Sequence, residues 1–240
     1  MTTAPTTPWA SKASALYDAG YARRYREHDD EFLASEPCRR FADWLRQVCA
    51  AFPPPIDVLD LGCGTGRYFW ALTGVRELVG IDASPAMLAE ARHPFNGDRI
   101  TAERVTLIEG DLFGHDFAPG RFDFVYSIGV LAEHVPLDEA VVAHVARWLK
   151  AGGRFAFSTV HPDSPSIPKT LPRRIGRAIA AAAPASLGRP LRARLLSRGL
   201  YADERRIAEL LTPGFAIEIV HQFESEAHLH CWCVARKQAT

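Results

Sequence analysis

The chain has 240 residues, 48% of them hydrophobic, which is enough for one sizeable core. Its formal charge is zero, with 28 basic and 28 acidic residues, and its five unevenly spaced cysteines exclude a disulfide framework. No apolar run reaches the roughly 18 residues that a membrane-spanning helix needs. We therefore expect buried free thiols and a protein of the reducing cytoplasm.

The first 14 residues lack the charged start and apolar core of a secretory signal, so we expect a disordered lead there. Residues 15–240 are predicted to form a single domain, with an N-terminal helical cap over 15–52 and a basic helical insert over 162–201. Between 164 and 202 lie eight basic residues and no acidic one. Subtracting these from the 28 basic residues leaves 20 against 28 acidic residues elsewhere, so an acidic body carries a basic insert.

Two helices are predicted first, over 11–28 and 37–52. Tyr17, Tyr21 and Tyr25 recur at four-residue spacing, which places them on one face of the first helix. A run of three prolines at 53–55 ends the second helix and separates it from the first strand.

Strands and helices then alternate, which is typical of a parallel sheet with helices on both faces. The predicted strands are 56–61, 77–82, 104–109, 122–128 and 154–159, and the predicted helices are 66–73, 84–92 and 137–149.

The alternation ends after His161, where several prolines divide a basic stretch into short helical pieces. A helix over 202–211 and two strands over 216–223 and 229–235 follow, and the strands are expected to pair as a hairpin at the sheet edge. The predicted fold is α/β: a doubly wound, mostly parallel, seven-stranded Rossmann-like sheet with an antiparallel edge hairpin and a helical lid insert.

The most informative stretch is 56–66, where a buried strand runs through a glycine turn toward a helix. Gly62, Gly64 and Gly66 permit unusual backbone angles and a close approach of a ligand to the backbone. A second apolar strand ends at Asp82, 16 residues after Gly66, where a ribose-binding carboxylate belongs. The pattern predicts a nucleotide-like ligand at the carboxyl ends of the strands.

Five segments in this order resemble the class I S-adenosylmethionine-dependent methyltransferases, over roughly residues 15–160. They are Val-Leu-Asp-Leu-Gly-Cys-Gly-Thr-Gly (58–66), Gly-Ile-Asp-Ala-Ser-Pro-Ala-Met-Leu (80–88), Glu-Gly-Asp-Leu (109–112), Phe-Asp-Phe-Val (122–125) and Leu-Lys-Ala-Gly-Gly-Arg-Phe (149–155). The resemblance implies S-adenosylmethionine as cofactor and S-adenosylhomocysteine as product. A nicotinamide dehydrogenase is the competing interpretation, but the glycine spacing is Gly-x-Gly-x-Gly rather than Gly-x-Gly-x-x-Gly.

The resemblance also implies which residues bind the cofactor. Asp82 would accept hydrogen bonds from the ribose hydroxyls, Asp111 would face the adenine amino group, and Asp60 with the glycine turn would hold the methionine and ribose parts. Met87 fits either adenine packing or the helix core, and the tyrosines fit either a lid over the cofactor or simple helix packing. The full implied set is Tyr17, Tyr25, Asp60, Gly62, Cys63, Gly64, Gly66, Asp82, Ala83, Met87, Asp111, Leu112, Ser127 and Ile128.

The acceptor chemistry is expected near Glu133 and His134, which follow the fourth strand. They lie in a Glu-His-Val-Pro segment that resembles small-molecule methyltransferases, including quinone-precursor O-methyltransferases. In those enzymes the acid–histidine pair is available to act as a base or to bind a divalent metal. Here Ala132 is an additional residue between Leu131 and Glu133. His134 is the first candidate base, against a structural role in the loop, and His161 is the second.

Other candidates are weaker. His228 and His230 alternate on one strand face, but without a third clear ligand we expect no metal. The arginine-rich insert at 164–201 predicts a lid for an anionic or membrane-surface acceptor, or else a solvated loop. No aromatic residue lies between 158 and 200, which makes a nucleic-acid partner unlikely.

The expected function is methyl transfer to a small molecule, most simply a hydroxyl or an amine of a secondary metabolite. Two alternatives stay open. One is a protein that binds S-adenosylmethionine without transferring its methyl group, such as a rearrangement catalyst, and the other is a methyltransferase of protein or RNA.

Overall fold

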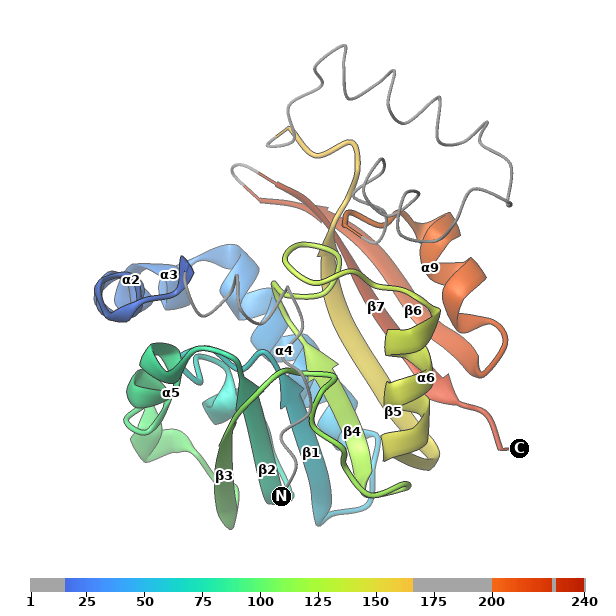
Figure 1. Ribbon diagram of the computed structural model, residues 1–240, viewed down its shortest axis with the longest axis horizontal. Coiled ribbons are helices and arrows are strands. Elements are labelled where there is room, and N and C mark those ends of the chain that lie inside the picture. The colour runs from blue at the N-terminus through green and yellow to red at the C-terminus, as the bar shows by residue number, and fades with distance from the viewer. Residues whose placement is uncertain (1–15, 166–199, 226–227, 240) are drawn as a thin grey trace.

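The computed structural model describes residues 16–165, 200–225 and 228–239. A single seven-stranded sheet runs through it in the order β3-β2-β1-β4-β5-β7-β6 (Figure 1). Strands β1 to β5 pair in parallel, whereas β7 is antiparallel to both β5 and β6. The predicted α/β fold with an antiparallel edge hairpin is therefore confirmed. The strands are β1 (Ile56–Leu61), β2 (Val75–Asp82), β3 (Arg104–Glu109), β4 (Phe122–Ser127), β5 (Leu149–Val160), β6 (Phe215–Glu224) and β7 (Leu229–Lys237).

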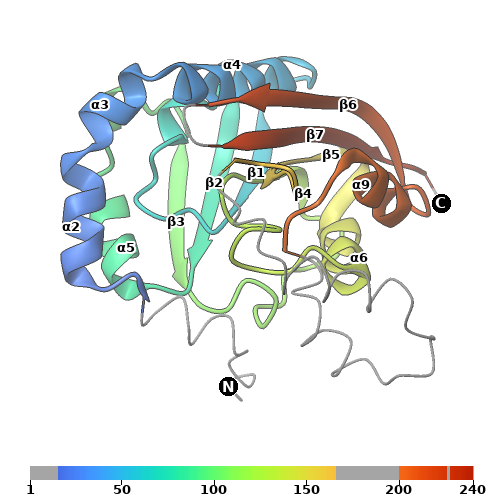
Figure 2. The ribbon, with the colours of Figure 1, turned by 90° about the horizontal axis from the view of Figure 1, so that it is seen from above.

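Helices cover both faces of this sheet (Figure 2). The α-helices are α2 (Ala19–Glu27), α3 (Asp29–Ala34), α4 (Glu36–Ala50), α5 (Pro85–Ala91), α6 (Glu139–Trp148) and α9 (Glu204–Leu211), and two single 3-10 turns are η1 (Phe69–Ala71) and η2 (Gly97–Arg99). Among the described residues, no helix is long and apolar enough to cross a membrane.

The core divides into two layers, one on each face of the sheet. Val58 of β1 packs in the layer under α4, together with Leu45, whereas its neighbour Leu59 packs in the layer under α6 and α9, together with Trp148. Successive residues of a strand point to opposite faces, so a strand with every residue buried must be covered on both sides. Packing on both faces therefore holds the central strands in place, and the candidate site lies at their carboxyl ends.

The predicted first helix is interrupted at Tyr17 and Asp18, and its described continuation is α2. It begins at Ala19 because Asp18 is its N-cap and accepts a hydrogen bond from the backbone N–H of Tyr21 at 2.8 Å. Tyr17 therefore precedes the helix, while Tyr21 and Tyr25 lie on it. Residues 1–15 of the predicted lead and helix lie outside the described residues, as do 166–199 of the predicted insert.

Two other segments differ from the prediction. The helix expected over 66–73 is only the turn η1, because β2 begins at Val75 in register with Ile56 and leaves few residues for a helix. The expected turn at Gly152 and Gly153 is an irregularity within the longer strand β5, where Gly152 has a φ of 74° and the register with β4 shifts. A Cβ on Gly153 would lie 2.9 Å from the carbonyl oxygen of Asp123, so a glycine lets β5 pass close to the backbone of β4 there.

Candidate functional site

The glycine turn after β1 has the geometry that its sequence predicts. Gly62, Gly64 and Gly66 have φ angles of 80°, 54° and 72°, which side chains with a Cβ rarely adopt. The backbone N–H groups of Gly62 and Cys63 both donate to the carbonyl of Ile81, at 2.8 and 3.1 Å, so the turn is held against the end of β2. A Cβ on Gly62 would lie 2.5 Å from Cγ2 of Val130, so no larger residue fits at this position without movement.

Asp82 joins this turn to the start of α5. One carboxylate oxygen accepts from the backbone N–H of Gly64 and the other from that of Ser84, each at 2.9 Å. Burial raises the pKa of Asp82, while these backbone hydrogen bonds act in the opposite direction. Because each carboxylate oxygen has two lone pairs, both oxygens can still accept a hydrogen bond from a ligand hydroxyl.

Asp60 lies beside Tyr126 of the adjacent strand, whose hydroxyl donates to the Asp60 carboxyl group at 2.6 Å. Burial raises the pKa of Asp60 to about 8, the hydrogen bond from Tyr126 lowers it in part, and the charge of Asp82 adds to the increase. A positively charged ligand group next to Asp60 would favour its carboxylate form. The site is thus suited to a cation that brings its own charge.

These groups face one cavity of about 780 Å³ at the carboxyl ends of β1 to β4. Most residues that the resemblance implies for cofactor binding line it. They are Tyr17, Tyr25, Asp60, Gly62, Cys63, Gly64, Asp82, Ala83, Met87, Asp111, Leu112 and Ile128. Met87 lines the cavity and is itself buried, so its packing against adenine stays a prediction.

Three predicted residues do not line the cavity. Ser127 is fully buried and donates its hydroxyl hydrogen to the Leu61 carbonyl at 2.8 Å, and Gly66 faces the ring of Phe69. His161 lies elsewhere, beside Glu204 and Cys231.

Other residues line the cavity that the sequence analysis did not assign to the cofactor site. They include Tyr126, Arg67 and His228, which was named only as half of a possible metal pair. Tyr126 pairs in register with Asp60 of β1, which places it beside the cavity. This pairing cannot be predicted until the order of the strands in the sheet is known. The further lining residues are Tyr21, Arg24, His28, Thr65, Tyr68, Phe113, Gly129, Val130 and Val135.

The loop after β4 carries Glu133 and His134 into the cavity wall. The extra residue, Ala132, takes a left-handed conformation with φ of 59°, and its carbonyl accepts a hydrogen bond from the N–H of Tyr201. The N–H groups of Glu133 and His134 both donate to the carbonyl of Val130, at 3.3 and 2.9 Å. The extra residue is thereby absorbed in the turn, and both functional side chains still reach the cavity.

Glu133 and His134 have different surroundings. The Nε2 atom of His134 lies 3.0 Å from the hydroxyl of Tyr17, and their rings meet edge to face. Within the described part of the chain, Oε1 of Glu133 is buried without a hydrogen-bond partner. Burial raises the pKa of Glu133 to about 7, so its carboxyl group can gain or lose a proton near neutral pH.

The segment that carries the tyrosines is anchored to the body by a buried ion pair. Asp29 is fully buried and accepts hydrogen bonds from Nε of Arg67 at 2.6 Å and from Nη1 of Arg26 at 3.2 Å. The guanidinium group of Arg67 lies over the ring of Tyr25, 3.9 Å from its centre. These contacts hold the α2–α3 segment against the glycine turn and so form one wall of the cavity.

Comparisons with known proteins agree with this geometry. Residues 58–153 match a family model described as a methyltransferase domain. Over 111 residues, the chain is 39% identical to a ubiquinone biosynthesis O-methyltransferase of Thiobacillus denitrificans, covering 45% of this chain and 46% of that protein. The chain spans about half the length, or less, of the curated relatives that it matches.

Two solved structures share the fold over almost the whole chain. A magnesium protoporphyrin IX methyltransferase from Synechocystis, with S-adenosylhomocysteine bound, is 18% identical and superposes with a TM-score of 0.65, covering 96% of this chain and 100% of that one. The [4+2]-cyclase SpnF is 13% identical and has a TM-score of 0.68, with 100% of both chains covered. The resemblance found in the sequence therefore agrees with a methyltransferase-domain match over residues 58–153 and with the fold of the two structures.

The buried ion pair yields a stability prediction. Asp29→Ala leaves the guanidinium of Arg67 buried without its carboxylate, so we expect a loss of about 3–5 kcal/mol in the free energy of unfolding. Asp43→Ala is the matched control, because Asp43 pairs with Arg46 on the exposed surface, where an ion pair contributes about 1 kcal/mol or less. Urea denaturation measures both variants, and equal losses would contradict the anchoring role of Asp29.

Proposed function

We propose that the protein transfers a methyl group from S-adenosylmethionine to a small-molecule acceptor and releases S-adenosylhomocysteine. One observation carries the proposal: a single cavity brings the glycine turn, Asp82 and Asp111 from three successive strand ends together with Glu133 and His134. The first group is suited to a nucleoside donor, and the second is suited to a proton-bearing acceptor. The matching family model and the O-methyltransferase relative support the same activity.

The residues on the donor side fit the cofactor. Both Asp82 oxygens retain lone pairs for the ribose hydroxyls, and Asp111 with Leu112 lines the part of the cavity assigned to the adenine. A Cβ on Gly64 would lie 3.3 Å from Cε of Met87, so the glycine keeps the cavity open at that point. Asp60 supplies a carboxyl group whose charged form is favoured next to a sulfonium or an ammonium group.

The cofactor supplies an activated methyl group, so the protein mainly has to align the acceptor and manage its proton. Glu133 is the group best suited to accept that proton. It lines the cavity, its Oε1 has no hydrogen-bond partner within the described residues, and its pKa of about 7 is matched to neutral conditions. His134, already in contact with Tyr17, is assigned to orienting the acceptor. His161 lies outside the cavity lining and is not assigned to this step.

An acceptor of limited size with a hydroxyl or amine group fits this cavity. The O-methyltransferase relative favours oxygen as the acceptor atom. Arg24 also lines the cavity, and its guanidinium group favours an acceptor with a negative charge.

A second function has a specific observation in its favour. The [4+2]-cyclase SpnF shares this fold over the full length of both chains, so the fold by itself does not distinguish methyl transfer from another reaction. Only methyl transfer produces S-adenosylhomocysteine and a methylated acceptor. Incubation with S-adenosylmethionine and a panel of phenols, carboxylic acids and amines is expected to yield S-adenosylhomocysteine and an acceptor heavier by one methylene unit. Tight cofactor binding without either product across the panel would favour the second function.

Asp82 provides the test of the donor side. Asp82→Ala removes the acceptor of the ribose hydroxyls, so we expect the affinity for S-adenosylhomocysteine, measured by isothermal titration calorimetry, to fall roughly ten- to a hundredfold. Asp82→Asn keeps the shape and is expected to lose less. A thermal melt of each variant checks folding, and an unchanged affinity in a folded Asp82→Ala protein would contradict the assignment.

Glu133 provides the test of the acceptor side. Because the carboxylate is the active form, kcat/KM is expected to rise with pH through about 7 and then level off. Glu133→Gln is expected to lower kcat by roughly a hundredfold or more and to remove this rise.

His134→Ala is the companion variant. It is expected to reduce turnover far more than cofactor affinity while keeping the rise near pH 7, because Glu133 is still present. If the rise persists in Glu133→Gln and disappears in His134→Ala, the base is His134 and the assignment to Glu133 is wrong.

A further inference from the structure

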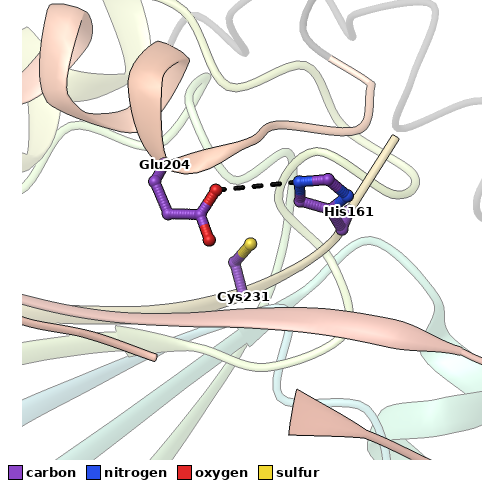
Figure 3. Close-up of side chains that lie close together, drawn as sticks. All are labelled: His161, Glu204 and Cys231. Atoms are coloured by element: carbon purple, nitrogen blue, oxygen red, sulfur yellow. Dashed lines mark ion pairs between the residues drawn. The ribbon is translucent and has the colours of Figure 1, made fainter. Parts of the chain in front are cut away.

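A second group of reactive side chains lies outside the cavity, where β5, β7 and the start of α9 meet. Figure 3 shows His161, Glu204 and Cys231 pointing toward one another from these three elements. One potential ligand atom of each lies within 4.8 Å of those of the other two. We propose that these three side chains bind a divalent transition-metal ion, for which Zn²⁺ is the best match.

The sheet register explains why two of the ligands meet. Cys231 of β7 pairs directly with Thr159 of β5, so their side chains lie on the same face of the sheet. His161 follows Thr159 by two residues and keeps to that face, which makes it a diagonal neighbour of Cys231. Its backbone N–H donates to the carbonyl of Leu229 at 2.8 Å, so the end of β5 is held beside β7.

The third ligand is positioned by the start of α9. Glu204 is the first residue of this helix, and the hydroxyl of Thr159 donates to the carbonyl of Ala202 at 3.1 Å, which ties the helix start to β5. Oε2 of Glu204 then lies 3.7 Å from Nε2 of His161. The other carboxylate oxygen accepts a hydrogen bond from the side-chain amide of Gln222, the residue of β6 that pairs with Cys231. Glu204 and Cys231 thus lie in regular secondary structure, and His161 directly follows the end of β5.

The donor set identifies the class of metal. A thiolate and an imidazole favour Zn²⁺ and its neighbours over Mg²⁺ or Ca²⁺, which prefer oxygen ligands. Zinc bonds of about 2.0–2.3 Å arranged as a tetrahedron place donor atoms roughly 3.3–3.7 Å apart, close to the separation of His161 and Glu204. Three protein ligands leave the fourth position for water.

Metal binding would displace one proton from Nε2 of His161 and one from the Cys231 thiol. At present the backbone N–H of Asp163 donates to Nδ1 of His161 at 3.0 Å, so the neutral ring carries its proton on Nε2. Metal binding at Nε2 would place that proton on Nδ1, so the Asp163 N–H would give up its hydrogen bond to the ring, and the Asp163 carboxylate, 3.9 Å away, would accept a hydrogen bond from Nδ1–H after a small shift. The thiol proton of Cys231 passes to solvent. Such a carboxylate behind a metal-bound histidine is a common way to orient the ring.

The position of the site indicates a structural role for the metal. His161 and Glu204 stand at either end of the chain segment 162–203, so one ion bound to both would fix the two ends of that segment relative to β7. The carbonyl of Leu229 that holds His161 belongs to the residue after His228, which lines the cavity. The metal would stabilise this side of the cavity without touching its contents, and it gives His161 and Cys231 functions that the sequence analysis did not assign.

The experiment is metal binding by the full chain after treatment with a chelator. Zn²⁺ titrated against a competing chromophoric chelator is expected to bind in one equivalent with a dissociation constant below about 1 μM. Co²⁺ is expected to give a thiolate-to-metal charge-transfer absorption band. Cys231→Ala should remove the band and weaken Zn²⁺ binding at least a hundredfold. Glu204→Gln, a change at a partly exposed position, should weaken binding roughly ten- to a hundredfold and leave the band in place.

Cys233→Ala is the matched control, because Cys233 is equally buried on the same strand and face, two residues beyond the site. It should keep both the band and the affinity, and circular dichroism confirms that each variant is folded. The proposal is overturned if the folded wild-type chain shows no saturable binding of one equivalent, or if Cys231→Ala binds Zn²⁺ as tightly as Cys233→Ala. None of these readouts depends on methyl transfer.

Discussion

The hydrogen bond from the Gly64 N–H to the Asp82 carboxylate, 2.9 Å long, is the contact on which the site depends. It joins the turn after β1 to the end of β2, and the second oxygen of the same carboxylate holds the start of α5 through Ser84. The sheet register brings Asp60 and Gly80 side by side, so the two strand ends arrive at the same level. One carboxylate therefore both shapes the turn and presents its remaining lone pairs to a ligand.

Local sequence predicts the parts of the molecule that local chemistry determines. The strand, glycine turn and acid at 56–82 and the edge hairpin all follow from residue type and spacing, and the structure has them. The prediction missed one local signal, because Asp18 caps α2 and Tyr17 therefore precedes that helix. Elsewhere it fails where distant contacts decide: the turn η1 replaces a helix because β2 begins early, in register with Ile56. The pairing of Asp29 with Arg67 spans 38 residues and left no trace in the sequence pattern.

Burial raises the pKa of three acidic groups in the site, but their hydrogen-bond partners differ. Asp82 keeps backbone donors that stabilise its charge, whereas Asp60 has one neutral hydroxyl partner and a pKa of about 8. Glu133 has its pKa raised to about 7 by burial. Three carboxyl groups around one cavity thus offer a hydrogen-bond acceptor, a partner for a cation and a proton acceptor, and their surroundings rather than their residue type make the difference.

The α2 segment is attached to the body at two ends of unequal strength. At one end the carboxylate of Asp29 is buried with two arginines. At the other end Tyr17 meets His134 through an exposed contact, and its carbonyl accepts a hydrogen bond from the Ser84 hydroxyl at 2.6 Å. An exposed pair contributes about 1 kcal/mol, several times less than a buried ion pair. The α2 segment therefore joins a strong attachment to the glycine turn with weaker ones to α5 and to the loop after β4, so a single segment ties together three of the elements that line the cavity.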